Sequence, residues 1–185
     1  KLALALLPNH KNTDKIDKQI KTLDSMITNI LLSDKMASAY SNLKKESIQV
    51  KTLLSRAMEL TFVKNIQLES DGAIFLSVDV VKSSIALKNL IENAEKYSPK
   101  NSKIIVKALE TDFEISILVI DEGPGIPKHQ LNKITTAFVR IGEKKQSGFG
   151  LGLSICKKVM RAHKGKLKIQ NNKNGGACFS MIFPK

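Results

Sequence analysis

Residues 104–120 read IIVKALETDFEISILVI, and this stretch decides the fold. Two apolar, alternating runs, 104–109 and 113–120, have the period of strands. Thr111 and Asp112 separate them and are typical of a turn. We therefore expect an antiparallel hairpin here.

Helical patterns flank this hairpin. Residues 80–97 carry a long helical pattern that stops at Ser98-Pro99, because the residue before a proline disfavours the helical conformation. Further strands are expected at 47–50, 66–70, 73–77, 166–170 and 177–183, and further helices through Leu53–Leu60 and from the glycine-rich segment 148–152 to about His163. Mixed helices and antiparallel hairpins predict an α+β fold, a two-layer α/β sandwich.

The front of the chain has a different pattern. Ile16, Ile20, Leu23, Ile27 and Ile30 recur at alternating steps of four and three residues, a seam of heptad type. We expect residues 1–44 to form a partial helical hairpin that pairs two chains, and residues 45–185 to form a second domain. The alternative is that the front helix packs on its own globular domain.

The composition argues against a membrane-spanning chain and against a nucleic-acid-binding protein. The chain has 185 residues, 42% of them hydrophobic, and a net charge of +13. No apolar run approaches the roughly 20 residues that cross a bilayer, and a chain that begins with Lys1 is expected to continue upstream. The basic residues are scattered and mostly lysine, whereas groove readers favour arginine, so nucleic acid is not an expected partner. Cys156 and Cys178 are predicted to be small core residues in a reducing compartment.

Two asparagines one helical turn apart form the first candidate site. Asn89 and Asn93 share a face of the 80–97 helix, with Lys96 and Tyr97 on the next turn. An asparagine carbonyl is a hard, neutral ligand that Mg²⁺ accepts when phosphates and water supply the rest. The alternative is a solvated helix face on which Glu92 and Lys96 form an ordinary ion pair.

A carboxylate and two glycines follow the apolar strand that ends at residue 120. Asp121 stands where the chain leaves the core and can accept the amino proton of adenine, while Gly123 and Gly125 let the backbone pass close to a flat base. The alternative is a tight turn without a ligand.

A second set of glycines, Gly148, Gly150 and Gly152, runs directly into a helix. Backbone amides and the helix N-terminus could receive phosphate oxygens there. Neither the strand spacing of a Rossmann site nor the lysine of a P-loop is present. Upstream, Phe138 and Arg140 suit a mobile lid whose guanidinium reaches a phosphate, or else an apolar plug with a surface arginine.

In chain order, the segments around Asn89, Asp121, Phe138 and Gly148 resemble the N, G1, F and G2 boxes of sensor histidine kinases. Gly175-Gly176 before the last strand resembles the G3 box. The resemblance covers about residues 46–185. It implies the histidine kinase ATP-binding type of sandwich, which gyrase, mismatch-repair and heat-shock-chaperone ATPases share, with ATP and Mg²⁺ as ligands.

The resemblance also implies a role for each matching residue. Asn93 becomes the Mg²⁺ ligand, Asn89 its neighbour at the phosphates and Lys96 a phosphate ligand, and these three are the expected catalytic residues. Tyr97 would lie against the base or ribose. The other implied nucleotide contacts are Asp121 on the adenine amino group, Gly123, Gly125 and Ile126 near the base, the lid residues Phe138 and Arg140, and Gly148, Gly150, Leu151 and Gly152 along the triphosphate.

One position separates the branches of this fold. The ATP-hydrolysing relatives place a glutamate where this chain has Asn89, and an amide cannot deprotonate a water molecule. The family's acceptor motif, close to His-Glu-x-x-Thr-Pro, is absent, so we expect the chain to lack its own phosphoacceptor histidine. His10, His129 and His163 are expected to be surface residues.

The implied function is the ATP-binding catalytic part of a two-component sensor histidine kinase. The γ-phosphoryl group of ATP would pass to a protein histidine and then to an aspartate of a response regulator. The chain would be the cytoplasmic portion of an inner-membrane sensor protein, a homodimer that meets the membrane only through segments absent here. The alternatives are an ATPase of the same fold and a non-catalytic interaction module with a vestigial pocket.

Overall fold

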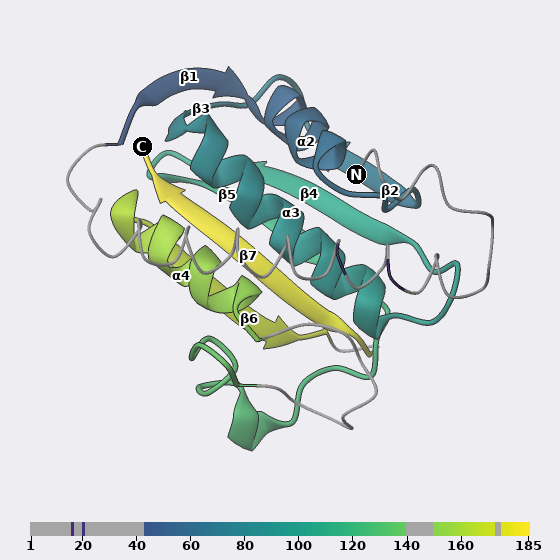
Figure 1. The fold of residues 1–185 in the computed structure, drawn as a ribbon. Helices are drawn as coiled ribbons and strands as arrows, with labels where there is room; N and C mark the ends of the chain where they lie inside the picture. Colours follow the sequence, from purple (N-terminus) through teal and green to yellow (C-terminus); the bar gives the residue numbers. More distant parts are fainter. Residues whose placement is uncertain (1–15, 17–19, 21–42, 140–149, 173–174) are drawn as a thin grey trace.

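The computed structural model describes residues 16, 20, 43–139, 150–172 and 175–185. The strands are β1 (Lys45–Gln49), β2 (Ile66–Ser70), β3 (Phe75–Asp79), β4 (Ile104–Glu110), β5 (Glu114–Ile120), β6 (Lys166–Asn171) and β7 (Ala177–Pro184). The helices are α2 (Val50–Glu59), α3 (Val80–Tyr97) and α4 (Gly152–Ala162), with a 3-10 turn, η2 (Lys128–Gln130), after β5. Together they confirm the predicted α+β sandwich, in which helices cover one face of a sheet (Figure 1).

Five strands form the main sheet, in the order β2-β4-β5-β7-β6. The pair β2–β4 is parallel and the other pairs are antiparallel. A parallel pair requires a crossover between its strands, and here β3 and α3 provide it. The remaining strands, β1 and β3, form a separate antiparallel ribbon in which Lys45 pairs with Asp79.

The core lies between the sheet and helices α2, α3 and α4. Alternation along β5 buries Ile115, Ile117 and Val119 on the helix side, as the sequence pattern predicts. Helix α3 crosses the middle of the sheet, with α4 beside it (Figure 1), and contributes fully buried Leu87 and Leu90. The sheet and the helices therefore bury a single apolar layer between them.

Both ends of α3 are set by local chemistry, and its bounds match the prediction. Asp79 is the N-cap: its Oδ1 accepts the Lys82 N–H at 3.0 Å, and its Oδ2 contacts Lys82 Nζ at 2.7 Å. Burial alone would raise the pKa of Asp79, but the hydrogen bonds from Lys82 outweigh it and lower that pKa. At the other end Ser98 turns extended, with a ψ of 157°, ahead of Pro99.

Some expectations need correction. His163 is buried rather than at the surface, with 2% of its area exposed, because the end of α4 packs against the start of α3. The strand expected at 73–77 begins later, at Phe75, and ends at Asp79; it follows a bend at Gly72, which has a φ of +84°. Both cysteines are free and buried, as predicted.

The front helical hairpin stays a prediction, because it lies outside the described residues apart from Ile16 and Ile20, which are helical. Within the described ranges no helix is both long and apolar enough to cross a membrane.

Candidate functional site

The two asparagines of α3 face the start of α4. Asn89 is 5% exposed, and its Nδ2 has no hydrogen-bond partner among the described residues. Asn93 lies one turn further on and is half-buried. A Cβ built on Gly152 would stand 3.6 Å from the Asn89 Cβ and 3.8 Å from the Asn93 Nδ2. Since buried amides are normally paired, the unpartnered Nδ2 beside a helix N-terminus marks a place for a polar ligand.

Lys96 and Tyr97 continue this line at the end of α3. Both are half-buried, and the Lys96 Nζ lies 4.9 Å from the centroid of the Tyr97 ring. Glu92 pairs with Lys88, at 2.9 Å, and not with Lys96, so the alternative of a Glu92–Lys96 ion pair is wrong. Lys96 has no carboxylate partner among the described residues, which leaves its ammonium available to an anion.

Asp121 is held rigidly at the end of β5. It is 4% exposed, and its Oδ1 accepts hydrogen bonds from the Gly123 N–H at 2.8 Å and the Ala177 N–H at 2.9 Å. Its Oδ2 accepts none from the described part of the chain. A Cβ on Gly123 would stand 2.8 Å from the Tyr97 carbonyl oxygen, so the segment after Asp121 passes directly over the end of α3. The carboxylate thus has one oxygen, Oδ1, held by two backbone N–H groups and the other, Oδ2, available to a ligand.

The rest of this segment is tied to the end of β6. Gly125 has a φ of +75°, which favours glycine. The Ile126 N–H donates to Asn171 Oδ1 at 2.8 Å, and Asn171 Nδ2 donates back to the Ile126 carbonyl at 2.8 Å. The Ile126 side chain packs against the core. Sequence reasoning missed Asn171, because it belongs to none of the four motifs; its one signal is a polar residue at the end of a strand before a glycine-rich turn.

Phe138 and Gly150 bring the lid segment to the second glycine-rich segment. The Phe138 N–H donates to the Gly150 carbonyl at 3.0 Å, and the Phe138 side chain is 68% exposed. Gly150 has a φ of +71°, and a Cβ there would stand 2.6 Å from the Val139 carbonyl oxygen. Leu151 is buried and packs in the core. The predicted residues Arg140 and Gly148 lie outside the described residues.

The polar side chains of the asparagine site fit a metal ion that binds together with a substrate. Among the described residues no group of three or more histidine, cysteine or acidic side chains could hold a metal ion. The polar side chains beside Gly152 are instead the amides of Asn89 and Asn93, and an amide carries a neutral carbonyl oxygen. Such a set suits Mg²⁺ that keeps phosphate oxygens and water as its other ligands.

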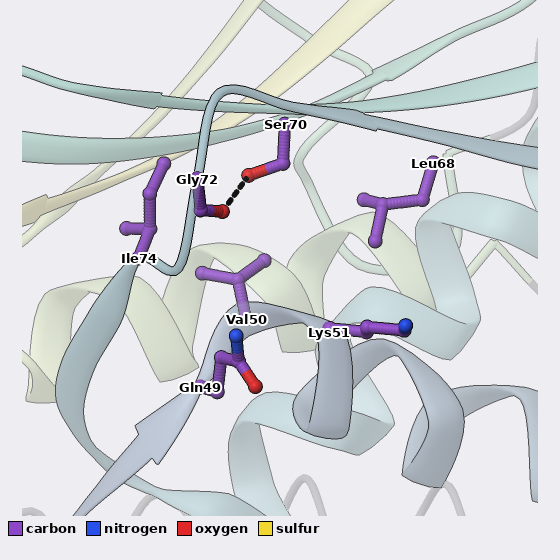
Figure 2. A pocket seen from close by; sticks show the side chains of 7 residues that line it. All are labelled: Gln49, Val50, Lys51, Leu68, Ser70, Gly72 and Ile74. Carbon is purple, nitrogen blue, oxygen red and sulfur yellow. Dashed lines mark hydrogen bonds between the residues drawn. The ribbon is translucent and has the colours of Figure 1, made fainter.

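A hollow of about 280 Å³ lies elsewhere, between the start of α2 and the β2–β3 turn (Figure 2). Its lining residues are Gln49, Val50, Lys51, Leu68, Ser70, Gly72 and Ile74. None of the predicted site residues lines it. Ser70 Oγ donates to the Gly72 carbonyl at 3.1 Å, so this hydroxyl is paired within the turn. The hollow is therefore separate from the asparagine site.

Comparisons with known proteins identify the family of this chain. Residues 79–185 match the family described as histidine kinase-, DNA gyrase B-, and HSP90-like ATPase. Over 180 residues the chain is 31% identical to the adaptive-response sensory kinase SasA of Synechococcus sp. (strain JA-2-3B'a(2-13)), covering 92% of this chain and 48% of that protein. It is 33% identical over 168 residues to the sensor protein KdpD of Clostridium acetobutylicum, covering 86% of this chain and 19% of that protein.

A solved structure is similar as well. The catalytic domain of histidine kinase ThkA superposes with a TM-score of 0.67 at 27% identity, covering 77% of this chain and 96% of that chain. The present chain spans less than half the length of the two curated relatives.

Proposed function

The chain belongs to the family of histidine kinase-, DNA gyrase B- and HSP90-like ATPases, and from this premise we propose that it is the ATP-binding catalytic part of a two-component sensor histidine kinase. The γ-phosphoryl group of ATP passes to a histidine of a protein acceptor and then to an aspartate of a response regulator. The relatives named as sensory kinases support this choice within the family.

The observation that carries the proposal is the unpartnered amide of Asn89 beside Asn93 and Gly152. Asn93 would hold Mg²⁺ together with the phosphate oxygens, and Asn89 would contact the phosphates. The ion, when bound, neutralises charge that develops on the transferring phosphoryl group. Lys96 and the backbone amides at Gly150 and Gly152 would supply further donors to the triphosphate, because the first amides of a helix have no partner within it.

The adenine end is assigned to Asp121 and its neighbours. The free Oδ2 of Asp121 accepts the amino proton of the base, since Oδ1 is already engaged by two backbone N–H groups. Gly123 passes close to the Tyr97 backbone and Gly125 close to the Asn171 amide, and we assign the backbone of this segment to the face of the base. Arg140 and Gly148 remain proposed phosphate contacts from the sequence resemblance alone.

Transfer is favoured over hydrolysis by two side chains of α3. Asn89 cannot remove a proton from water, and the nearby carboxylate of Glu92 is engaged by Lys88 at 2.9 Å. The proposed reaction therefore uses an acceptor imidazole: its nitrogen bonds to the γ-phosphorus while the bond from that phosphorus to the bridging oxygen breaks, and ADP leaves with the electron pair. The contribution of the chain is position and charge.

The wider assignments are proposals of the same kind. They are a homodimer formed through residues 1–44, a separate domain at 45–185, an acceptor histidine outside this chain, a response regulator as partner, and a place in the cytoplasmic portion of an inner-membrane sensor protein. Sequence patterns support the first three. The relatives named as a sensory kinase and a sensor protein support the response regulator, and the membrane assignment rests on the sequence resemblance.

The test is titration of the 185-residue chain with ATP, with and without Mg²⁺, followed by incubation with a separately supplied histidine acceptor domain. We expect Mg²⁺-dependent ATP binding and transfer of the labelled γ-phosphoryl group to the acceptor. ATP binding with steady release of phosphate, lost in Asn89→Ala, would favour the ATPase alternative. No binding at millimolar MgATP would favour the interaction module.

A further inference from the structure

The segment from Asp121 to Ile126 is anchored at both of its ends to the same β-hairpin end. At the first end, the Asp121 N–H donates to the Ala177 carbonyl at 3.0 Å and the Ala177 N–H returns a bond to Asp121 Oδ1 at 2.9 Å. At the second end, Asn171 holds Ile126 through two hydrogen bonds of 2.8 Å each. Asn171 is the register partner of Ala177 across the β6–β7 ladder. Two residues that pair across the β6–β7 hairpin therefore fix where both ends of the segment lie.

The two anchors differ in kind. The first end is bound by backbone groups of Ala177, which any residue except proline would supply there, together with the Asp121 side chain. The second end depends on one side chain, the amide of Asn171. Gly125, just before Ile126, also lies against this amide: a Cβ on Gly125 would stand 3.1 Å from Asn171 Oδ1. The side chain thus sets where Gly125 and Ile126 lie.

The chemistry of the contact requires an amide. Asn171 offers one acceptor and one donor in a plane, and Ile126 offers the complementary N–H and carbonyl of its own peptide backbone. Alanine would lose both bonds. Aspartate, nearly the same in shape, would keep an acceptor for the N–H but place a carboxylate oxygen against the Ile126 carbonyl.

We propose that Asn171 is a positioning residue for the adenine end of the site, a role that rests on the function proposed above. It holds the Gly125–Ile126 backbone in a fixed position relative to Asp121 Oδ2, so that the binding site for the base is formed before the nucleotide arrives. Preorganisation of this kind contributes to affinity because the loop does not have to be ordered when the ligand binds. Asn171 contacts no reacting atom, so it acts on binding of the base and not on the transfer step.

The experiment titrates the full chain and its Asn171→Ala and Asn171→Asp variants with MgATP and MgADP. We expect the Kd for both nucleotides to rise by the same factor, about five- to twenty-fold, in each variant. Gln170→Ala is the matched control, because it removes an exposed side chain from the preceding residue of β6 and should leave both values unchanged. With a supplied acceptor domain, KM for ATP should rise and kcat at saturating ATP should stay the same.

Three outcomes would overturn the inference. The first is a wild-type chain that binds MgATP while Asn171→Ala or Asn171→Asp binds it equally well; the proposed function would then stand and the positioning role would fall. The second is a loss for ATP without a loss for ADP, or a fall in kcat at constant KM, since either would place the effect at the phosphates. The third is a wild-type chain that binds no nucleotide, which removes the proposed function and the inference together. Circular dichroism and thermal unfolding of each variant distinguish a variant that does not fold from one that folds and binds nucleotide more weakly.

Discussion

His163 accepts a hydrogen bond from the backbone N–H of Asp79 through Nε2, at 2.9 Å, although the two residues are 84 positions apart in the chain. Its Nδ1 donates to the Val159 carbonyl at 2.8 Å, and its ring meets Phe183 edge-on, with centroids 5.7 Å apart. Both ring nitrogens are therefore committed, one as donor and one as acceptor, which defines the neutral tautomer. The end of α4 is joined in this way to the N-cap of the helix that carries the asparagines.

Acid should weaken the fold through this residue. Burial, together with the positive charges of Lys45 and Lys82, lowers the pKa of His163 from 6.5, against the opposing effects of Val159 and Asp79. Between the lowered value and 6.5 the unfolded chain binds more protons than the native chain, so stability is lost as pH falls through this window and is constant above it. Urea unfolding at a series of pH values from 7.5 downward should show this slope.

The variant His163→Gln should flatten that slope, at a cost of about 2–4 kcal/mol from lost packing and hydrogen bonds. Replacing the exposed His129 with Gln is the control and should keep the slope. A slope that persists in His163→Gln would show that other groups cause it.

Removal of the carboxylate at residue 121 should weaken nucleotide binding without unfolding the chain. In Asp121→Asn the amide oxygen can still accept the Gly123 and Ala177 N–H groups, but an NH₂ donor replaces Oδ2 and faces the amino group of the base. We expect a loss of about 1–3 kcal/mol in ATP affinity by calorimetry. Glu122→Gln, an exposed neighbour, should bind as the wild type does; equal affinity of both variants would mean that the base lies elsewhere.

Loss of the amide at residue 93 should remove the dependence of ATP binding on magnesium. Asn93→Ala deletes the proposed metal ligand, so the gain in affinity that Mg²⁺ provides should fall by about ten-fold or more. Titrations with Mg²⁺ and with EDTA measure that gain directly. Glu95→Ala, an exposed position of the same helix, serves as the control. An unchanged gain in Asn93→Ala would refute the assigned ligand.

The two glycines before β7 should differ sharply in their tolerance of alanine. Gly176 has a φ of +80°, and a Cβ there would collide with the Asp121 carbonyl. Gly175 has a φ of +95°, but nothing lies within 4 Å of a Cβ built on it. We expect Gly175→Ala to cost about 1 kcal/mol from backbone strain alone, and Gly176→Ala to cost about 3 kcal/mol or more and to displace Asp121.

Denaturant unfolding and ATP titration of this pair test both effects. Equal stabilities would show that the turn can shift Gly176 away from Asp121.

Local patterns explain why much of the fold follows from the sequence. The bounds of α3 could be predicted because a helical period leads to Pro99, and the Asp79 cap and the extended Ser98 in the structure account for its ends. The β4–β5 hairpin could be predicted because strand alternation and turn residues are short-range signals. The grouping of Asn89, Asn93 and Gly152 is implied by the resemblance, and a Cβ built on Gly152 would lie within 4 Å of both asparagine side chains.

Long-range contacts explain what could not be predicted. The parallel β2–β4 pair and the β1–β3 ribbon depend on sheet order, which no local period encodes. His163 stands in a polar-looking stretch at a helix end, and its burial arises from the distant Asp79. The contact of Asn171 could not be predicted either, because its partner is the backbone of Ile126, and a backbone group leaves no residue-type signal at the partner position.

The small ribbon of β1 and β3 has a mechanical consequence. Its ladder ends with Lys45 opposite Asp79, and the Lys44 N–H also reaches Asp79 Oδ2 at 3.3 Å. A force on the backbone that enters β1 therefore acts on Asp79, the residue that caps α3. Helix α3 carries both asparagines. A pull or twist on β1 would therefore reach the helix that carries Asn89 and Asn93 through its N-cap.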